Sequence, residues 1–318
     1  MKIGFIGLGN VGAKLAGSIA RNGHELWVRD LNHELAEPFV AKGAHWSDSP
    51  AAMAKACDIV ITCLPSPAAC AAVMEDKNGL LAGLRTGKVW IEMSTTDAKE
   101  VARLAVLVEQ SGARAAECPV SGGCHRAATG NIAIFAGCSR DTFDEILPVL
   151  TVLGRRVLHT GVIGTASSLK VMTNFLATAN LVAVSEALTT CKALGLDMNT
   201  TYEAIRISSG NSFVHETEGQ VILNGSRDIN FTMDLVLKDI SLFQDLANGV
   251  GVGLDMSPLL ISLFKDGIER FGPRELSPNI IKRLEEATGL DVTTPGFPAE
   301  IIDDEPEEPG YEVVINKS

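Results

Sequence analysis

Positive charge is scarce in this chain. Its 318 residues include 27 lysines and arginines against 39 aspartates and glutamates, which gives a net charge of -12 at pH 7. A nucleic-acid surface needs clustered cations to replace counterions. We therefore expect no nucleic-acid partner, although a local pocket in an acidic protein can still bind a small anion.

Metal-binding and targeting patterns are also missing. The seven cysteines form no C-x-x-C pair and no Cys/His cluster at zinc spacing. Their odd number and apolar neighbours, as in DIVITCLP, are typical of reduced core residues, and we predict no metal site. The first residues lack the charged region, apolar run and cleavage site of a signal peptide, so we expect a cytoplasmic protein.

No apolar run reaches the length of about 18 residues that a membrane span requires. The strongest candidate, residues 165–194, is interrupted by Lys170, Asn174, Asn180 and Glu186. A helix that is apolar on almost every side is instead expected to be buried, as a core helix joining two domains or packed against a second subunit. We therefore predict no membrane association, and a homodimer or homotetramer.

Short apolar runs alternate with helical patterns in the first half of the chain. This alternation predicts crossover units and a mostly parallel sheet. The expected strands are KIGFIG, HELWVRD, DIVITCL, KVWIEMS, ARAAECPV, NIAIFAG and RRVLHTG, and the expected helices are residues 11–22, 35–41, 67–74, 97–111 and 141–153.

Three glycines follow the first strand at G-x-G-x-x-G spacing. The first permits a tight turn, the second lets a pyrophosphate approach the backbone, and the third lets the strand and helix pack closely. The phosphates then lie at the positive end of the helix. We therefore predict a dinucleotide site at Gly7, Leu8, Gly9, Asn10, Val11 and Gly12.

The second strand ends in Asp30, 18 residues after Gly12. An acid at this place can accept hydrogen bonds from both ribose hydroxyls and repels the extra phosphate of NADP, which favours NAD. The neighbouring Arg29 could accommodate that phosphate, so NADP stays open as an alternative.

The length of the chain predicts more than one domain. We expect an α/β Rossmann-type dinucleotide-binding domain over residues 1–163, a long interdomain helix over 164–194 and an all-α C-terminal domain over 195–294. Residues 295–318 are rich in proline and acids and cannot build a core. They are expected to be either disordered or a strap on another surface, such as that of a neighbouring subunit.

Further stretches, in order along the chain, resemble the β-hydroxyacid dehydrogenase family. FIGLGNVGAKLA resembles its cofactor signature and ECPVSGG its substrate-binding stretch, and the following ATGNIAIFAG is also similar to the family. GVIGTASSLKVMTN resembles its catalytic helix and FTMDLVLKDISL its C-terminal cofactor-contacting stretch. The resemblance covers residues 1–289. It implies reversible hydride transfer between a nicotinamide and a carbinol carbon β to the carboxylate of a small 3-hydroxy acid.

The resemblance also implies roles for residues outside the glycine loop. Leu64 and Pro65, together with Thr95, would lie along the cofactor, because they follow strands and face the crevice of a doubly wound sheet. Lys238 matches a lysine near the nicotinamide, although a salt bridge with Asp239 is the alternative. The remaining pocket residue is Phe231.

The substrate carboxylate is assigned to Ser121, Gly122 and Gly123, which offer a hydroxyl and closely spaced backbone N–H groups. Lys170 matches the catalytic position, and Asn174 lies on the same helix face four residues later. Burial lowers the pKa of a lysine, which suits a group that donates and accepts a proton. Asn174 would bind the substrate or fix the lysine.

Three stretches depart from the family pattern. Gly164-Thr165-Ala166 stands in place of G-x-G, and Thr173-Asn174 in place of Asn-Asn. Cys124-His125-Arg126 replaces small residues, so Arg126 could pair with a second anionic group on the substrate or be a solvated loop cation. Two rival functions stay open: an imine reductase on the same fold, which the lysine disfavours, and a non-enzymatic cofactor-sensing protein.

Overall fold

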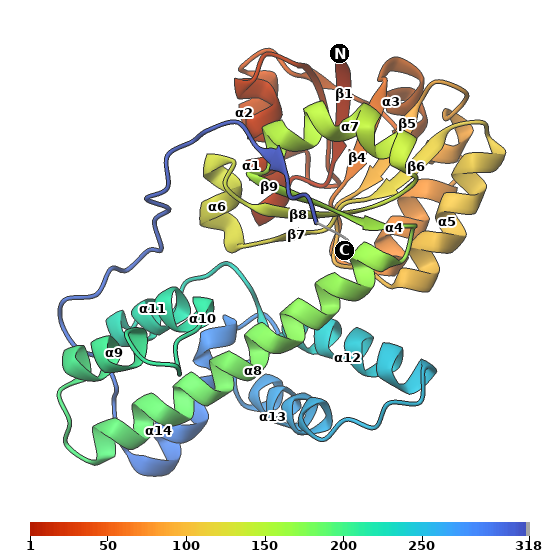
Figure 1. Ribbon diagram of the computed structural model, residues 1–318. Helices are drawn as coiled ribbons and strands as arrows, with labels where there is room; N and C mark the ends of the chain where they lie inside the picture. The colour runs from red at the N-terminus through yellow and green to blue at the C-terminus, as the bar shows by residue number, and fades with distance from the viewer. Residues whose placement is uncertain (316–318) are drawn as a thin grey trace. The chain divides into compact units, whose positions relative to one another are not determined.

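The computed structural model describes residues 1–315, and these form two compact units (Figure 1). The N-terminal unit contains residues 1–170 together with residues 303–315, and the helical unit contains residues 171–302. The polypeptide therefore passes from one unit to the other twice. The expected arrangement, a Rossmann-type domain followed by a long helix and an all-α region, is confirmed.

A mostly parallel sheet forms the centre of the N-terminal unit. Its strands lie in the order β10-β9-β8-β6-β5-β4-β1-β2-β3, and β7 pairs with β8. Only the β6–β8 and β7–β8 pairings are antiparallel among the described strands. The bounds are β1 Lys2–Ile6, β2 Glu25–Arg29, β3 His45–Trp46, β4 Ile59–Thr62, β5 Val89–Glu92, β6 Arg114–Glu117, β7 Val120–Ser121, β8 Ala133–Gly137, β9 Arg156–Gly161 and β10 Tyr311–Glu312.

Helices cover both faces of this sheet, so its central strands are apolar on both sides. Ile59 and Ile61 of β4 belong to one apolar cluster, whereas Val60 between them belongs to another. The helices are α1 Asn10–Arg21, α2 Glu37–Val40, α3 Pro50–Ala56, α4 Pro67–Glu75, α5 Ala98–Gln110, α6 Gly123–Thr129 and α7 Arg140–Leu153, with short 3₁₀ turns at His33–Leu35 and Leu80–Ala82.

Local capping explains why several of these helices begin where they do. Ser66, Asp97 and Ser139 each accept a hydrogen bond from a backbone N–H of the first turn, at α4, α5 and α7 respectively. The prediction of one continuous helix over residues 35–41 is wrong, because a 3₁₀ turn at His33–Leu35 and the four-residue α2 are observed instead. The stretch has no long amphipathic pattern to sustain a longer helix.

The helical unit surrounds a core of its own. Leu188, Ile222, Met233 and Phe264 are fully buried in it. Its helices are α8 Thr165–Ala193, which begins in the N-terminal unit, α9 Met198–Arg206, α10 Phe213–Glu216, α11 Glu218–Asn224, α12 Met233–Gly249, α13 Met256–Phe271, a 3₁₀ turn Ser277–Ile281 and α14 Lys282–Thr288.

The long helix α8 is the one described helix that is long and apolar enough to cross a membrane by length and composition. In the single chain, 33% of its most apolar 18-residue stretch is buried. The expectation that the helix is covered on every side is therefore not met within one chain. Leu176, for example, is 51% exposed.

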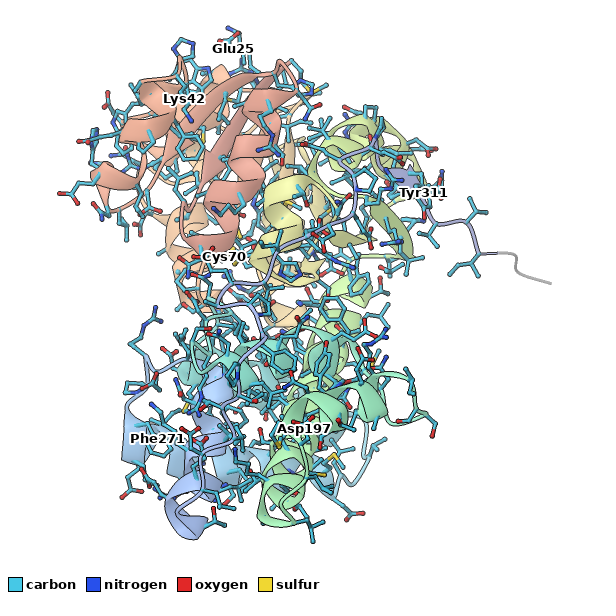
Figure 2. The ribbon with its side chains drawn as sticks, turned by 90° about the vertical axis from the view of Figure 1, so that its left-hand side faces the viewer. Glu25, Lys42, Cys70, Asp197, Phe271 and Tyr311 are labelled. Atoms are coloured by element: carbon cyan, nitrogen blue, oxygen red, sulfur yellow. The ribbon has the colours of Figure 1, made fainter. Side chains whose placement is uncertain are left out.

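The acidic tail is ordered against its own N-terminal unit. β10 adds a parallel edge strand to β9, with Tyr311 and Glu312 opposite Arg156 and Val157. Figure 2 shows Tyr311 at this edge of the sheet. Of the two alternatives left open by the sequence, the described tail is a strap, and the surface it covers belongs to the same chain.

Candidate active site

The glycine loop joins β1 to α1 through a tight turn. Gly7 has a φ of +97°, and a Cβ there would lie 2.2 Å from the carbonyl oxygen of Cys63. A Cβ at Gly12 would lie 2.0 Å from the oxygen of Gly7. At Gly9 a Cβ would meet nothing within 4 Å. The loop is thus closed on the protein side and open above Gly9, which fits a dinucleotide phosphate.

Asp30 fastens this loop to the second strand. Its Oδ2 accepts a hydrogen bond from the N–H of Leu8 at 2.7 Å, and its Oδ1 accepts one from Asn32 at 2.9 Å. Neighbouring Arg29 donates to the carbonyl oxygen of Ser47 at 2.8 Å and lies over the ring of Trp46. The carboxylate of Asp30 therefore lies at the glycine loop, whereas the guanidinium of Arg29 is bound to residues in and after β3.

The carboxyl ends of five strands meet along one edge of the sheet. Parallel pairing sets Ile6 of β1 opposite both Arg29 and Thr62, and sets Glu92 opposite Thr62 and Glu117. In a doubly wound sheet this is the edge at which ligands bind. The structure therefore brings the loops after β1, β2, β4, β5 and β6 to a common edge. These loops carry Gly7, Leu8, Gly9, Asp30, Leu64, Pro65 and Thr95, and the loop after β6 leads into β7, which ends at Ser121.

A buried carboxylate supports the loops after β4 and β5. Glu92 accepts hydrogen bonds from Thr62 Oγ1 at 2.5 Å, from Cys70 Sγ at 2.9 Å and from the N–H of Ser94 at 2.7 Å. Cys70 comes from α4 (Figure 2). Burial raises the pKa of Glu92, while these hydrogen bonds favour the ionised form.

Ser94 continues this network to the expected cofactor residues. Its Oγ accepts a hydrogen bond from the N–H of Leu64 at 2.7 Å. The turn that begins with Leu64 and Pro65 is thereby tied to the loop that contains Thr95.

The stretch at residues 121–123 turns sharply into α6. Gly122 and Gly123 have φ values of +130° and +86°, which side-chain-bearing residues rarely adopt. Ser121 ends β7, and Gly123 is the first residue of α6. His125 and Arg126 are therefore helical residues and not part of a loop, which corrects the alternative that Arg126 is a solvated loop cation. Arg126 is paired with Glu305 at 3.0 Å.

Glu117, at the end of β6, caps the helix that carries Lys170. Its Oε1 accepts hydrogen bonds from the N–H groups of Gly164 at 2.7 Å and Ala166 at 2.8 Å, and its Oε2 accepts one from Ser167 Oγ at 2.5 Å. Lys170 follows within the first two turns of α8 and is 7% exposed. Burial raises the pKa of Glu117, whereas the three donors favour its ionised form.

The helical unit holds the other candidates. Asn174 Nδ2 donates to Asp239 Oδ2 at 2.5 Å, and Lys238 Nζ lies 2.7 Å from Asp239 Oδ1. The salt bridge considered for Lys238 is thus present. Phe231 is half-buried and packs against the core of the unit. Asp239 thus links Asn174 to Lys238; the sequence suggested its contact with Lys238 but not the one with Asn174.

Two family models together match most of the chain. Residues 2–161 match the NAD binding domain of 6-phosphogluconate dehydrogenase, and residues 164–284 match the NAD-binding domain of NADP-dependent 3-hydroxyisobutyrate dehydrogenase. The chain is 32% identical to 2-(hydroxymethyl)glutarate dehydrogenase of Eubacterium barkeri over 294 residues, which is 92% of this chain and 98% of that protein. The chain belongs to the β-hydroxyacid dehydrogenase family.

Solved structures agree with this membership. The 3-hydroxyisobutyrate dehydrogenase of Mycobacterium tuberculosis with L-serine is 25% identical, with a TM-score of 0.80 over 89% of this chain and 98% of that one. An imine reductase of Myxococcus stipitatus in complex with NADP⁺ shares the fold at 17% identity, with a TM-score of 0.62 over 89% of this chain and 99% of that one. As a β-hydroxyacid dehydrogenase family member, the chain is an NAD(P)-dependent oxidoreductase acting on a CH–OH group.

Sequence reasoning did not single out Glu117 or Glu92. Each had a usable signal, because each acid ends an apolar strand, in ARAAE and KVWIE. A carboxylate that is buried in this way needs donors around it. No group of three or more His, Cys, Asp or Glu side chains in the described residues could hold a metal ion.

Proposed function

We propose that this chain catalyses reversible hydride transfer between a nicotinamide cofactor and the β-carbinol of a small 3-hydroxy acid, similar to 3-hydroxyisobutyrate or a more polar analogue. The observation that carries the proposal is buried Lys170, which lies on a helix capped by the carboxylate that ends β6. Family membership supports the reaction class.

In this proposal the pyrophosphate lies on the loop that contains Gly7, Leu8, Gly9, Asn10, Val11 and Gly12. Asp30 accepts hydrogen bonds from the adenosine ribose and gives a preference for NAD over NADP. Leu64, Pro65, Thr95 and Lys238 contact the rest of the cofactor. When bound, the nicotinamide supplies the hydride chemistry, and the protein supplies orientation and proton transfer.

The substrate is held by its carboxylate at Ser121, Gly122 and Gly123, which offer a hydroxyl and closely spaced backbone N–H groups. Lys170 Nζ gives or takes the hydroxyl proton as the hydride moves. Asn174 orients the hydroxyl group or the lysine, and Phe231 lines the pocket.

Arg126 pairs with a second anionic group where the substrate has one. Two points support this role: the side chain of Arg126 lies against Gly122 of the carboxylate stretch, and the relative from Eubacterium barkeri is named for a dicarboxylate. A second carboxylate would share the guanidinium with Glu305.

The test is a substrate panel read by absorbance of the reduced cofactor. Wild type, Lys170→Ala and the control Lys192→Ala, at the other end of α8, are assayed with 3-hydroxy acids, semialdehydes and cyclic imines. We expect turnover of a 3-hydroxy acid that falls about 10²–10⁴-fold in Lys170→Ala, while the control is unaffected and cofactor binding survives. A near-normal kcat in Lys170→Ala contradicts the mechanism. Turnover of imines alone favours the imine reductase, and cofactor binding without turnover favours a sensor.

For the assembly, we propose a cytoplasmic homodimer or homotetramer that associates with neither membranes nor nucleic acid. The partly exposed apolar surface of α8 supports self-association, because a second copy would cover it. The acidic net charge supports the absence of a nucleic-acid partner.

A further inference from the structure

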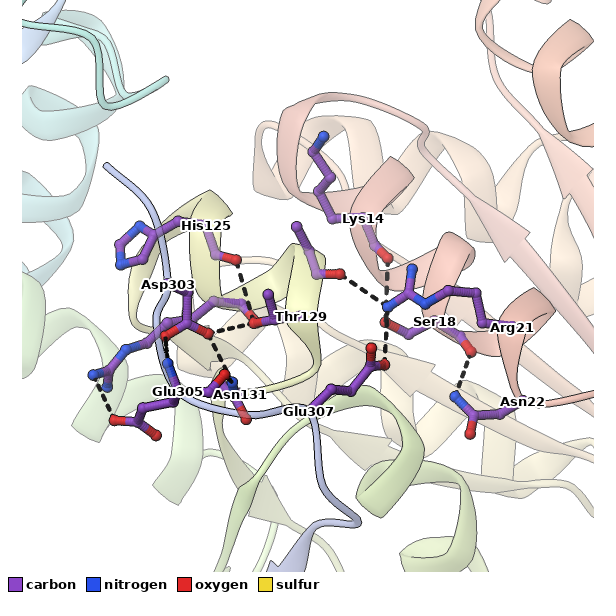
Figure 3. Close-up of polar contacts among 12 residues, drawn as sticks. Lys14, Ser18, Arg21, Asn22, His125, Thr129, Asn131, Asp303, Glu305 and Glu307 are labelled. Atoms are coloured by element: carbon purple, nitrogen blue, oxygen red, sulfur yellow. Dashed lines mark hydrogen bonds and ion pairs between the residues drawn. The ribbon is translucent and has the colours of Figure 1, made fainter. Parts of the chain in front are cut away.

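The acidic strap, residues 303–312, makes its first contacts with α6 and the residues just after it (Figure 3). Asp303 Oδ2 accepts hydrogen bonds from Thr129 Oγ1 and, at 2.7 Å, from Asn131 Nδ2. Asn131 Nδ2 also donates to the backbone oxygen of Glu305 at 2.9 Å. These contacts join residues more than 170 positions apart and hold the C-terminal end of α6.

Glu305 extends this anchoring to the substrate stretch itself. Its Oε1 accepts a hydrogen bond from Arg126 Nη2 at 3.0 Å, and its Oε2 lies 3.8 Å from Arg156. The stem of Arg126 crosses Gly122 so closely that a Cβ there would lie 3.2 Å from Arg126 Cδ. A continuous series of contacts therefore runs from Glu305 through Arg126 to Gly122.

The side chain of His125, next to Arg126 in α6, lies against Gly123. A Cβ at Gly123 would lie 2.8 Å from Cε1 and 2.9 Å from Nδ1 of His125. Burial, and secondarily the Arg126 charge, lower the pKa of His125, so the ring is neutral near pH 7. Two side chains of α6, Arg126 and His125, are thus the nearest neighbours of Gly122 and Gly123, and the strap contacts α6.

The rest of the strap has two anchors that do not involve α6: Glu308 pairs with Arg155, and Glu312 pairs with Arg140 at 2.6 Å. Glu307 pairs with Arg21 at 3.2 Å, and Arg21 also donates to the backbone oxygen of Ala128 in α6 at 2.9 Å. β10 also pairs with β9. Loss of one carboxylate near α6 therefore leaves the strap attached, which permits matched controls on the same segment.

We propose that Asp303 and Glu305 are positioning residues for substrate binding. They fix α6 and Arg126, and through them the backbone of residues 121–123 that receives the substrate carboxylate. The inference rests on the proposed function of that stretch. It assigns a role to a segment that lies beyond residue 284, where the family models end.

The experiment compares the double variant Asp303→Asn/Glu305→Gln with the control Glu308→Gln. We expect the KM for the hydroxy acid to rise roughly tenfold in the double variant, because small displacements of a positioning group are costly. The dissociation constant for the reduced cofactor and the melting temperature should match those of the control. Glu305→Gln should add nothing in an Arg126→Ala background, because it acts through that side chain.

Hydrogen exchange supplies a readout that does not depend on turnover. Amides of residues 121–131 should exchange faster in the double variant than in Glu308→Gln, with no change around the glycine loop. An active double variant with the control's KM, or with unchanged exchange at residues 121–131, overturns the inference and leaves the proposed function standing. A wild type that turns over no 3-hydroxy acid overturns the proposed function, and the kinetic inference with it.

Discussion

Replacing Glu117 tests how much its hydrogen bonds to the start of α8 stabilise the fold and position Lys170. Glu117→Ala removes the acceptor for two backbone N–H groups and for the hydroxyl of Ser167, at 2.7, 2.8 and 2.5 Å. Each buried donor left without a partner costs about 1–3 kcal/mol, so loss of the acceptor for all three should lower the free energy of unfolding by about 3–9 kcal/mol. Glu117→Gln keeps an amide oxygen for the two N–H groups and should cost only about 1–2 kcal/mol.

The assays are urea unfolding followed by circular dichroism, and steady-state turnover. The exposed Glu109, on α5, provides the control variant Glu109→Gln. Glu117→Gln should stay folded but lose roughly tenfold in kcat, because the start of α8 sets the place of Lys170. The reasoning is refuted if Glu117→Ala unfolds within about 1 kcal/mol of wild type, since the three hydrogen bonds would then contribute little.

Three further predictions concern cofactor choice, pH and assembly. Asp30→Asn keeps an acceptor for Leu8 but loses its charge, so kcat/KM with NADP should rise relative to NAD; a wild type that already prefers NADP contradicts this. Burial raises the pKa of Glu218 from 4.5 to about 8, and its Oε2 is buried without a hydrogen-bond partner among the described residues. When the pKa of a carboxyl group is raised in the folded state, the free energy of unfolding of the protein falls as pH rises from 4.5 toward 8. The free energy of unfolding of wild type should therefore fall by about 2 kcal/mol relative to that of Glu218→Gln between pH 6 and 8. Parallel pH dependences in urea unfolding would disprove this. Light scattering should give at least twice the chain mass of 33.7 kDa, and a single species at the monomer mass would exclude self-association.

Sequence patterns predicted the elements that are specified locally. The helix expected at residues 97–111 is observed as Ala98–Gln110, because Asp97 caps it and its apolar positions follow a helical period. The long helix expected over residues 164–194 is observed as Thr165–Ala193. The parallel order follows from strands such as Ile59–Thr62, which are apolar on both faces.

The sequence could not predict elements that depend on distant partners. α6 opens with two positive-φ glycines, which are poor helix formers, and it is held by Asp303 and Glu305. β10 is two residues long, and it is a strand because its backbone pairs with the edge of β9. Glu117 receives its hydrogen bonds from the start of α8, and Glu92 receives two of its three from β4 and α4, so local spacing does not predict these contacts.

The pairing of β10 with β9 has a consequence for how the chain is made. About 150 residues separate these parallel neighbours, so this contact closes one of the longest loops in the molecule. During synthesis on a ribosome, β9 is made before the helical unit, so the edge of β9 that binds β10 stays unpaired until the helical unit has been synthesised. An unpaired edge strand is a site for pairing with other chains. Residues 311–312 therefore complete the first domain only after the helical unit has been made, and a nascent or shortened chain leaves the edge of β9 exposed.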